Sequence, residues 1–252
     1  MNTPAMIIDF EATDVSKEAE ATQIGYRGVA FDDEGYLITE PCYEESTKYF
    51  ASYSMICKPD RAISYGAMAV SHIMPEDVAH ALNHRAVVQG VLPKGEAYII
   101  GHNIDYDIQV AANAGVDVSQ YKRICTQALA RRLLPDLDSH SLGALTYAIN
   151  TDLARQYCRN AHDAGWDVTF TLWLLEHLCE LGNITSMEHL YAASEIARIP
   201  TKFTFGKHHG KAIKDIAVTD RSYLQWIVKN HDNAYLVKAC SDALILSINI
   251  NV

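Results

Sequence analysis

The sequence lacks the long apolar stretch that a membrane-spanning helix requires. None of its uninterrupted apolar runs approaches the ~18 residues of a span, although the chain has 252 residues. The acidic Asp9 also follows Met1 too closely to leave room for the apolar core of a secretory signal. We therefore expect a cytoplasmic protein.

The sequence also lacks a C-x-x-C pair, internal repeats and low-complexity tracts. Its six cysteines are scattered, which in a chain of this length favours reduced thiols that fill the core over a disulfide framework or a zinc site. These residues are Cys42, Cys57, Cys125, Cys158, Cys179 and Cys240.

Positive charge is in short supply, because 21 lysines and arginines face 31 acidic residues and give a formal net charge of -10. Proteins that bind nucleic acid usually present basic surfaces, so this balance weighs against such a partner. A site for divalent cations must itself be acidic, however, and the bound ions reverse the local field. Basic residues also gather at Lys58 with Arg61, at Arg131 with Arg132, and over residues 202–211. The charge balance alone therefore does not decide whether the substrate is a nucleic acid.

Apolar runs and segments of helical period alternate along the first part of the chain. Strands are expected over 5–10, 23–31, 36–38, 55–58 and 97–101, with turn residues at 32–35 that predict a hairpin. Helices are expected from Pro75 onward and over 106–114, 126–134, 141–149 and 165–181. Strands that come early, followed by helices that alternate with them, predict an α/β domain with a mixed sheet.

The character of the sequence changes after Gly182, which ends the long predicted helix. Residues 203–210 are aromatic, basic and glycine-bearing, and a helical pattern with Tyr223 and Trp226 follows. We predict one domain over residues 1–184 and, over residues 185–252, a linker helix with a small C-terminal module.

Three short segments place carboxylates where predicted strands end or helices begin. The first is Asp9-Phe10-Glu11, in which both acids point to one side of the strand because strand side chains alternate. Adjacent carboxylates resist ionisation unless a cation neutralises them. Taken alone, such a pair is more often a solvated strand end.

The second segment, His102-Asn103-Ile104-Asp105-Tyr106-Asp107, directly follows the strand expected over 97–101. Polar groups at the junction of a buried strand and a helix are well placed for a site. Capping of the helix by Asn103 or Asp105 is the alternative interpretation.

The third segment, His162-Asp163-Ala164-Gly165-Trp166-Asp167, opens the long helix. The small Ala164 and Gly165 leave space for something bulky to approach. A surface histidine beside an exposed helical acid is the alternative.

In this order the three segments resemble the motifs of the DEDD exonuclease superfamily, His subtype: D-x-E, H-N-x-x-[FY]-D and H-x-A-x-x-D. Residues 58–64 and 124–133, and beyond the nuclease core 203–207, 210–212 and 223–226, are similar to its exodeoxyribonuclease X branch. The resemblance spans nearly the whole chain. It implies a ribonuclease H-like mixed sheet flanked by helices, with a small C-terminal appendage, and an exonuclease that removes nucleotides from DNA 3′ ends, single-stranded and as a second option double-stranded.

The resemblance also implies two Mg²⁺ ions, with Mn²⁺ as a substitute, since oxygen ligands and a phosphate substrate suit these cations. Asp9, Glu11 and Asp167 are assigned to one ion by this resemblance. Asp9 and Asp107 are assigned to the second ion, and His162 is the expected general base.

For substrate binding, the resemblance places Phe10 and Ala12 beside the terminal sugar, where Phe10 could also stack on the last bases. Core packing of Phe10 is an equal alternative. His102 and Asn103 are candidates to position a phosphate or to hold their loop. Arg131 could follow the phosphate backbone, against the alternative of plain surface solvation.

In the C-terminal module, Lys207 and Lys211 lie in a basic segment with glycines that suits DNA phosphate, while docking of a partner protein is the competing interpretation. Two other functions stay open. An RNA 3′ exonuclease could use the same residues, because the choice depends on how the 2′-hydroxyl is accommodated. A non-catalytic nucleic-acid binding protein could have kept the fold.

Overall fold

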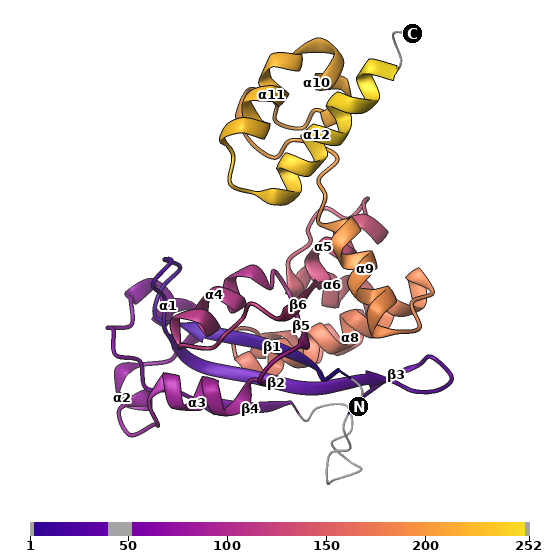
Figure 1. Ribbon diagram of the computed structural model, residues 1–252. Coiled ribbons are helices and arrows are strands. Elements are labelled where there is room, and N and C mark those ends of the chain that lie inside the picture. The colour runs from indigo at the N-terminus through magenta and orange to yellow at the C-terminus, as the bar shows by residue number, and fades with distance from the viewer. Residues whose placement is uncertain (1–2, 40–51, 250–252) are drawn as a thin grey trace. The chain divides into compact units, whose positions relative to one another are not determined.

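The computed structural model describes residues 3–39 and 52–249, without the side chains of residues 248 and 249 (Figure 1). Cys42 lies outside these residues. The chain divides into two compact units, Met1–Ser194 and Glu195–Val252. In the part of the chain that is described, no helix is long and apolar enough to cross a membrane.

A mixed sheet of six described strands forms the centre of the first unit (Figure 1). The strands are β1 (Ala5–Ala12), β2 (Ala21–Phe31), β3 (Leu37–Thr39), β4 (Tyr53–Ile56), β5 (Ala97–Gly101) and β6 (Tyr121–Cys125). β2 is antiparallel to β1, β3 and β4, whereas β5 is parallel to β1 and β6, so the order is β3-β2-β1-β5-β6 with β4 beside β2. The carboxyl ends of β1 and β5 therefore meet at one edge of the sheet, which is where the first two motifs lie.

The helices of the first unit surround this sheet. They are α1 (Tyr65–Ser71), α2 (Pro75–Val78), α3 (His84–Val91), α4 (Asp105–Asn113), α5 (Thr126–Leu133), α6 (Leu142–Ile149), α7 (Thr151–Tyr157), α8 (Ala164–Gly182) and α9 (Met187–Ala197), with a short 3₁₀ turn at Cys158–Asn160. The predicted mixed α/β sheet is confirmed. β4 begins and ends earlier than the predicted 55–58, and β6, α1, α3 and α7 were not predicted.

The long helix α8 packs against β1 and β2. Its first turn lies directly on β2, because Gly25 has no side chain and a Cβ there would overlap the carbonyl of Ala164. A Cβ at Gly165 would lie 3.0 Å from the Cβ of Ser54. The space expected beside the small Ala164 and Gly165 is therefore filled by the protein's own strands β2 and β4.

The division between the two units falls within α9, later than the boundary predicted at residues 184 and 185. The first part of α9 is fastened to the sheet of the first unit. The N–H of Cys125 donates to Ser194 Oγ at 2.9 Å, and the hydroxyl of Tyr98 donates to Glu188 Oε2 at 2.5 Å. Leu190 is also fully buried. These contacts place most of the predicted linker helix in the first unit.

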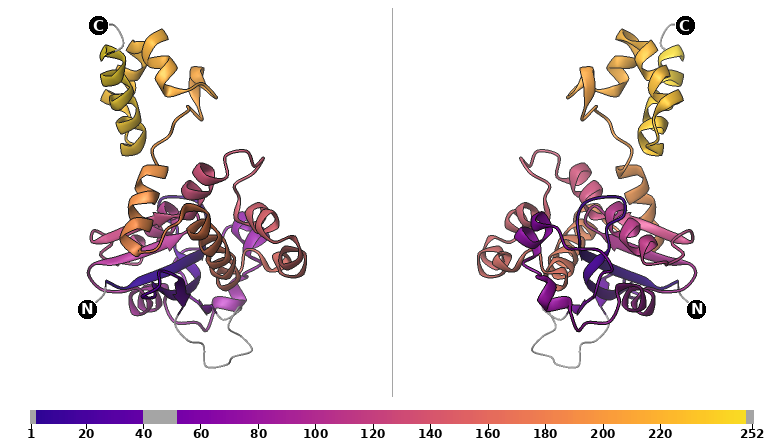
Figure 2. Two further views of the ribbon diagram at one scale, coloured as in Figure 1. Left: turned by 90° about the vertical axis from the view of Figure 1, so that its right-hand side faces the viewer. Right: turned by 90° about the vertical axis from the view of Figure 1, so that its left-hand side faces the viewer.

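The second unit is a small helical module, drawn in orange to yellow in Figure 2. Its helices α10 (Ile213–Thr219), α11 (Arg221–Asn230) and α12 (Ala234–Asn249) pack against one another, and a 3₁₀ turn at Gly206–His208 precedes them. Their apolar side chains close over Phe203, which is 1% exposed. The module therefore has a core of its own.

Candidate active site

Four carboxylates gather where β1 ends and α4 and α8 begin. Asp9 and Glu11 lie on β1, and Asp107 and Asp167 lie in the first turns of α4 and α8. Asp107 is 4% exposed, and its Oδ1 accepts the backbone N–H of Phe10 at 3.1 Å. This bond ties the start of α4 to β1, so acids that are far apart in sequence share one site.

Burial and mutual repulsion raise the pKa values of these acids. Burial, together with the charges of Asp107, Asp167 and Glu11, raises the pKa of Asp9 well above its ordinary value. Burial raises the pKa of Glu11 to about 8, with Asp167 as the next largest cause. The pKa values of Asp107 and Asp167 are also raised, mainly by burial. No lysine or arginine among the described residues compensates any of the four.

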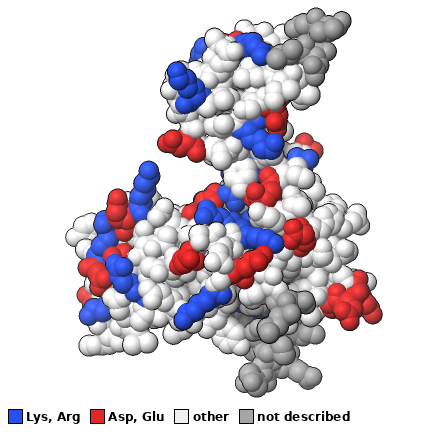
Figure 3. Space-filling view, viewed as in Figure 1, with Lys and Arg blue, Asp and Glu red and all other residues white. Residues whose placement is uncertain are grey.

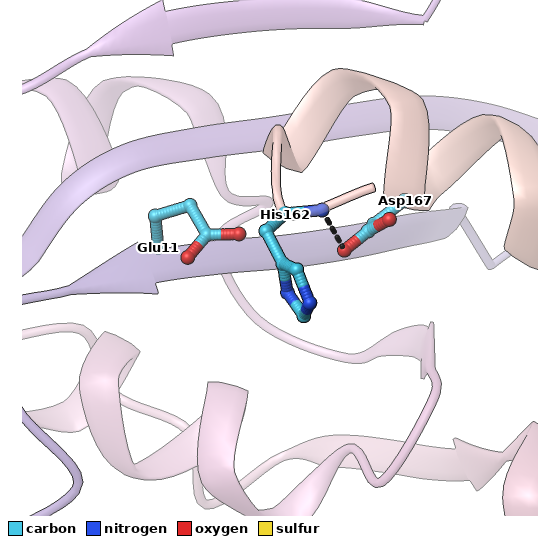
Figure 4. A group of neighbouring side chains, drawn as sticks. All are labelled: Glu11, His162 and Asp167. Carbon is cyan, nitrogen blue, oxygen red and sulfur yellow. Dashed lines mark hydrogen bonds between the residues drawn. The ribbon is translucent and has the colours of Figure 1, made fainter. Parts of the chain in front are cut away.

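His162 lies beside two of these acids, as Figure 4 shows. Glu11, His162 and Asp167 each offer a ligand atom within 4.8 Å of the others. The backbone N–H of His162 donates to Asp167 Oδ2 at 3.2 Å. His162 is exposed and has a φ of 69°, in the left-handed region that residues other than glycine seldom adopt. A strained backbone at an exposed histidine between two acids is typical of a functional position.

Sequence reasoning missed two residues that hold this corner of the site. Asp163 Oδ1 caps α8 by accepting the N–H groups of Gly165 and Trp166, both at 3.1 Å. Gln23, only 6% exposed, donates to Asp163 Oδ2 at 2.8 Å and accepts the N–H of Ala164 at 3.1 Å. Together they fix the segment that carries His162. The capping role of Asp163 was readable from its place before a helix, whereas Gln23 gave no local signal.

His102 is held on both sides by the protein. Its Nδ1 lies 3.1 Å from Thr126 Oγ1, and its Nε2 lies 3.0 Å from the carbonyl oxygen of His140. Burial lowers the pKa of His102 to about 4, so the ring is neutral near pH 7 and its Nε2 donates to His140. These bonds favour the interpretation that His102 holds its loop over the one that it positions a phosphate.

The alternative interpretation of this segment was capping of α4 by Asn103 or Asp105, and neither residue occupies the N-cap position. Ile104 occupies the N-cap position and supplies no side-chain bond, while Asp105 lies 3.8 Å from Arg123. Asn103 adopts a left-handed φ of 67°. Asparagine tolerates this conformation better than most residues, which accounts for its place in the turn between β5 and α4.

The remaining substrate-binding candidates differ in accessibility. Phe10 and Ala12 are buried, at 5% and 7% exposure, which favours core packing for the Phe10 ring and leaves their backbone beside Glu11. Arg131 is exposed in the last turn of α5, close enough for its charge to lower the pKa of His102. Their contact with substrate stays a prediction.

In the second unit, Lys207 and Lys211 have different surroundings. The Lys207 Nζ lies 2.7 Å from Asp220 Oδ2 and 5.0 Å from the centre of the Tyr223 ring, and His208 Nε2 lies 2.9 Å from the same Asp220 oxygen. Lys211 is exposed. The charge of Lys207 is thus balanced internally, so of these two lysines Lys211 is the freer to meet a phosphate.

The five cysteines within the described residues are free thiols, and four of them are buried, as expected of core residues. On the face drawn in Figure 3, basic and acidic side chains are interspersed rather than separated into two surfaces. The donor set at the edge of the sheet is made of carboxylate oxygens, and no lysine or arginine in the described part of the chain neutralises them. Such a set fits hard divalent cations.

An open mixed sheet with acids and a histidine gathered at this edge is the architecture of an exonuclease. Escherichia coli Exonuclease I, solved in complex with a dA16 oligonucleotide, has the same fold, with a TM-score of 0.56 at 19% identity over 79% of this chain and 44% of its own. Exonuclease X, solved in complex with 5′ overhanging duplex DNA, matches with a TM-score of 0.53 at 25% identity over 75% of this chain and 99% of its own.

Sequence similarity narrows the class to one family. The chain is 31% identical over 182 residues to Exodeoxyribonuclease 10 of Escherichia coli strain K12, which covers 71% of this chain and 78% of the relative. Residues 203–232 match the family described as Exodeoxyribonuclease X-like C-terminal. The chain belongs to the exodeoxyribonuclease X family of the DEDD exonuclease superfamily, and it is a nuclease.

Proposed function

We propose that this protein is a metal-dependent 3′→5′ exodeoxyribonuclease that hydrolyses phosphodiester bonds at DNA 3′ ends and releases nucleoside monophosphates. The observation that carries the proposal is the convergence of four carboxylates whose pKa values are raised and which, within residues 3–39 and 52–249, pair with no lysine or arginine. Keeping such acids together is unfavourable in a protein that has no bound cations. It is advantageous in a site that must hold cations.

Asp9, Glu11, Asp107 and Asp167 would hold two Mg²⁺ ions, for which Mn²⁺ could substitute. When bound, such a pair supplies charge compensation at phosphorus, activation of the attacking water and stabilisation of the leaving 3′-oxygen. Asp9 is the residue best placed to be shared, because the charges of Glu11, Asp107 and Asp167 all act on it. Asp107 already accepts the N–H of Phe10 with Oδ1, which leaves Oδ2 for a cation or its water.

His162 would act as the general base. Its ring stands at the open side of the site, next to the carboxylates of Glu11 and Asp167 (Figure 4). A histidine imidazole can take a proton from water near neutral pH, which the attacking water must lose as it bonds to phosphorus.

DNA is the substrate that the relatives support. The curated relative is named an exodeoxyribonuclease, and the solved relative was bound to duplex DNA with a 5′ overhang. In this chain the backbone of Phe10 and Ala12 would meet the terminal sugar. Arg131, Lys207 and Lys211 would meet the phosphate backbone, with His102 and Asn103 shaping the loop beside the metals.

The proposal is tested with single- and double-stranded DNA labelled at the 5′ end, incubated with Mg²⁺ in the presence or absence of EDTA. We expect a ladder of shortening labelled strands that EDTA abolishes, because digestion from the 3′ end leaves the label on the remaining strand. Immediate release of a labelled mononucleotide would overturn the direction. A matched RNA strand tests the alternative substrate, and faster digestion of RNA would overturn the preference for DNA.

A pair of variants links this activity to the site. Asp167→Asn removes one metal ligand and is expected to abolish the ladder. Asp136→Asn changes an exposed acid outside the site and should leave the ladder as it is. Equal activity of the two variants would contradict the assignment of the site.

A further inference from the structure

A second group of potential metal ligands shares no residue with the nuclease site. Glu20 precedes β2, Asp60 lies in the loop after β4, and His84 is the first residue of α3. One ligand atom from each of the three lies within 4.8 Å of the others. The Nε2 of His84 is 3.8 Å from Glu20 Oε2 and 3.7 Å from Asp60 Oδ2.

The imidazole of His84 is buried without a hydrogen bond. Its side chain is 0% exposed, and neither ring nitrogen has a hydrogen-bond partner among the described residues. A buried polar atom without a partner is unfavourable, so this ring calls for one. Its two carboxylate neighbours stand too far away for hydrogen bonds and close enough to share a cation.

Both carboxylates are oriented by bonds to other groups. Glu20 Oε2 accepts the backbone N–H groups of Asp60 and Arg61 at 2.7 and 2.8 Å. Asp60 Oδ1 accepts the side-chain amide of Asn83 at 2.9 Å. Glu20 Oε1 and Asp60 Oδ2 accept no hydrogen bond among the described residues. Asp60 is therefore held by Oδ1 and faces His84 with Oδ2, whereas Glu20 faces His84 with the same oxygen that holds the loop.

We propose that Glu20, Asp60 and His84 bind a Zn²⁺ ion. A donor set of one imidazole and two carboxylates suits zinc, which takes nitrogen and oxygen ligands in a tetrahedral arrangement, whereas magnesium prefers oxygen ligands alone. Zinc bonds of ~2.0–2.2 Å place tetrahedral ligand atoms roughly 3.3–3.6 Å apart. The separation of 3.7 Å between His84 Nε2 and Asp60 Oδ2 needs to close by only a few tenths of an ångström. Glu20 approaches His84 most closely, at 3.8 Å, with Oε2, the oxygen that also accepts two backbone N–H groups. Asp60 is 57% exposed, which leaves an open side for water as the fourth ligand.

Arg85 is the internal competitor for this ion. Its guanidinium lies 3.7 Å from Asp60 Oδ2 and 4.0 Å from Glu20 Oε1, and its side chain is 50% exposed. Its Nη1 also donates to the carbonyl of Asn113 at 3.3 Å, so an ion that binds here has to displace the guanidinium from the two acids. The bound ion would fasten the loop after β4 to α3, which are already joined because the His84 N–H donates to the carbonyl of Lys58 at 2.9 Å.

The test uses the full chain with Glu11→Gln and Asp167→Asn, so that the nuclease site no longer competes for metal. Zn²⁺ binding is measured by isothermal titration and by equilibrium dialysis in excess Mg²⁺, with Co²⁺ as a spectroscopic probe. We expect one Zn²⁺ per chain that Mg²⁺ does not displace, and visible Co²⁺ absorption of the intensity typical of a tetrahedral site. His84→Ala and Asp60→Asn should each weaken Zn²⁺ binding at least ~10-fold.

Two further variants complete the design. Asp136→Asn, a matched exposed acid, should bind Zn²⁺ as the parent does, and Arg85→Gln should bind it more tightly because the competing cation is gone. If the parent binds no Zn²⁺, or if Asp60→Asn binds it unchanged, the site does not exist. Asp60 is exposed, so this variant decides the question even if His84→Ala fails to fold. Either outcome leaves the proposed nuclease function intact, since the two sites share no residue.

Discussion

The pKa values of carboxylates shift in opposite directions in two regions of the molecule, the nuclease site and Asp220 of the C-terminal module. Burial and mutual repulsion raise the pKa of Glu11 and its neighbours. Bonds from Lys207, His208 and Ser222 hold the pKa of Asp220 far below its usual range. Among the described residues, no lysine or arginine pairs with the first group, whereas Lys207 and His208 contact Asp220.

The contrast explains why the negative net charge of the chain is a poor guide to its partner. An acid that is already paired contributes to the sum without attracting a ligand, while unpaired acids at one edge of a sheet concentrate cations. The same reasoning separates Lys207 from Lys211. Local pairing, rather than the total, decides which charges can act on a substrate.

The largest expected effect is on the rate of hydrolysis, and it distinguishes loss of the chemical step from loss of cation binding. His162→Ala should lower the rate of hydrolysis roughly 10²–10⁴-fold, because the attacking water loses its proton acceptor. Mg²⁺ binding should persist, since the four carboxylates remain. The measurements are single-turnover hydrolysis and Mg²⁺ titration. His80→Ala, at an exposed histidine outside the site, is the control; near-normal hydrolysis by His162→Ala would remove this residue from the reaction.

The pH dependence of the free energy of unfolding tests whether the acids of the site repel one another in the metal-free protein. The pKa of Glu11 rises from 4.5 to about 8 in the folded protein. A raised carboxyl pKa favours folding most below the unfolded value, and this contribution is lost as the pH rises through the folded value. The metal-free protein should therefore lose stability between pH 5 and pH 8.

Mg²⁺ should restore that stability at pH 8, by about 2.7 kcal/mol at a concentration 100 times its dissociation constant. Chemical unfolding at both pH values, with and without Mg²⁺, measures the effect. Glu11→Gln should flatten the pH dependence of the metal-free protein. An unchanged pH profile in that variant would show that the repulsion lies elsewhere.

Removal of Asp220, which is paired, should change stability in the opposite direction to removal of Glu11, which pairs with no lysine or arginine in the part of the chain that is described. Asp220→Asn takes away a negative charge that Lys207 and His208 both contact, so the module should become less stable, whereas Glu11→Gln should make the metal-free protein more stable near pH 8. Hydrogen exchange of α10–α12 reports on the module alone. Slower exchange in Asp220→Asn would reverse the comparison.

The smallest expected effect concerns the two lysines. If the module contacts DNA phosphate, Lys211→Ala should reduce the slope of log affinity against log salt by about 1. Lys207→Ala should change it less, because Asp220 already pairs with that lysine. Binding of a labelled oligonucleotide across a salt series measures both. Unchanged slopes in both variants would favour docking of a partner protein instead.

Each acid of the site is a weak signal alone, and the four were singled out because three segments together resemble the DEDD motifs. Their positions in the fold were predictable from local patterns. Asp9 and Glu11 end an apolar strand, and Asp107 and Asp167 lie in the first turns of helices, which the strand and helix periods reveal. β6 was missed because its residues Lys122 and Arg123 are partly exposed and interrupt any apolar run. Propensity carries little information at such an edge strand.

Contacts over long sequence separations were beyond local patterns. The bond from Gln23 to Asp163 joins residues 140 positions apart, and a polar residue inside a strand gives no hint of such a partner. The Glu20, Asp60 and His84 group is drawn from three separate segments for the same reason. The contact-based division of the chain falls later than the predicted boundary, and the bond from Cys125 to Ser194 that contributes to it cannot be read from α9 itself.

The left-handed backbone of His162 has an evolutionary consequence. Glycine adopts this conformation without strain, so the histidine keeps a conformation that a smaller residue would accept more readily. Selection for thermal stability alone would favour glycine at this position. If His162 is the general base, as proposed, lineages that keep the nuclease activity should retain histidine here, and lineages that lose it should exchange it for glycine early.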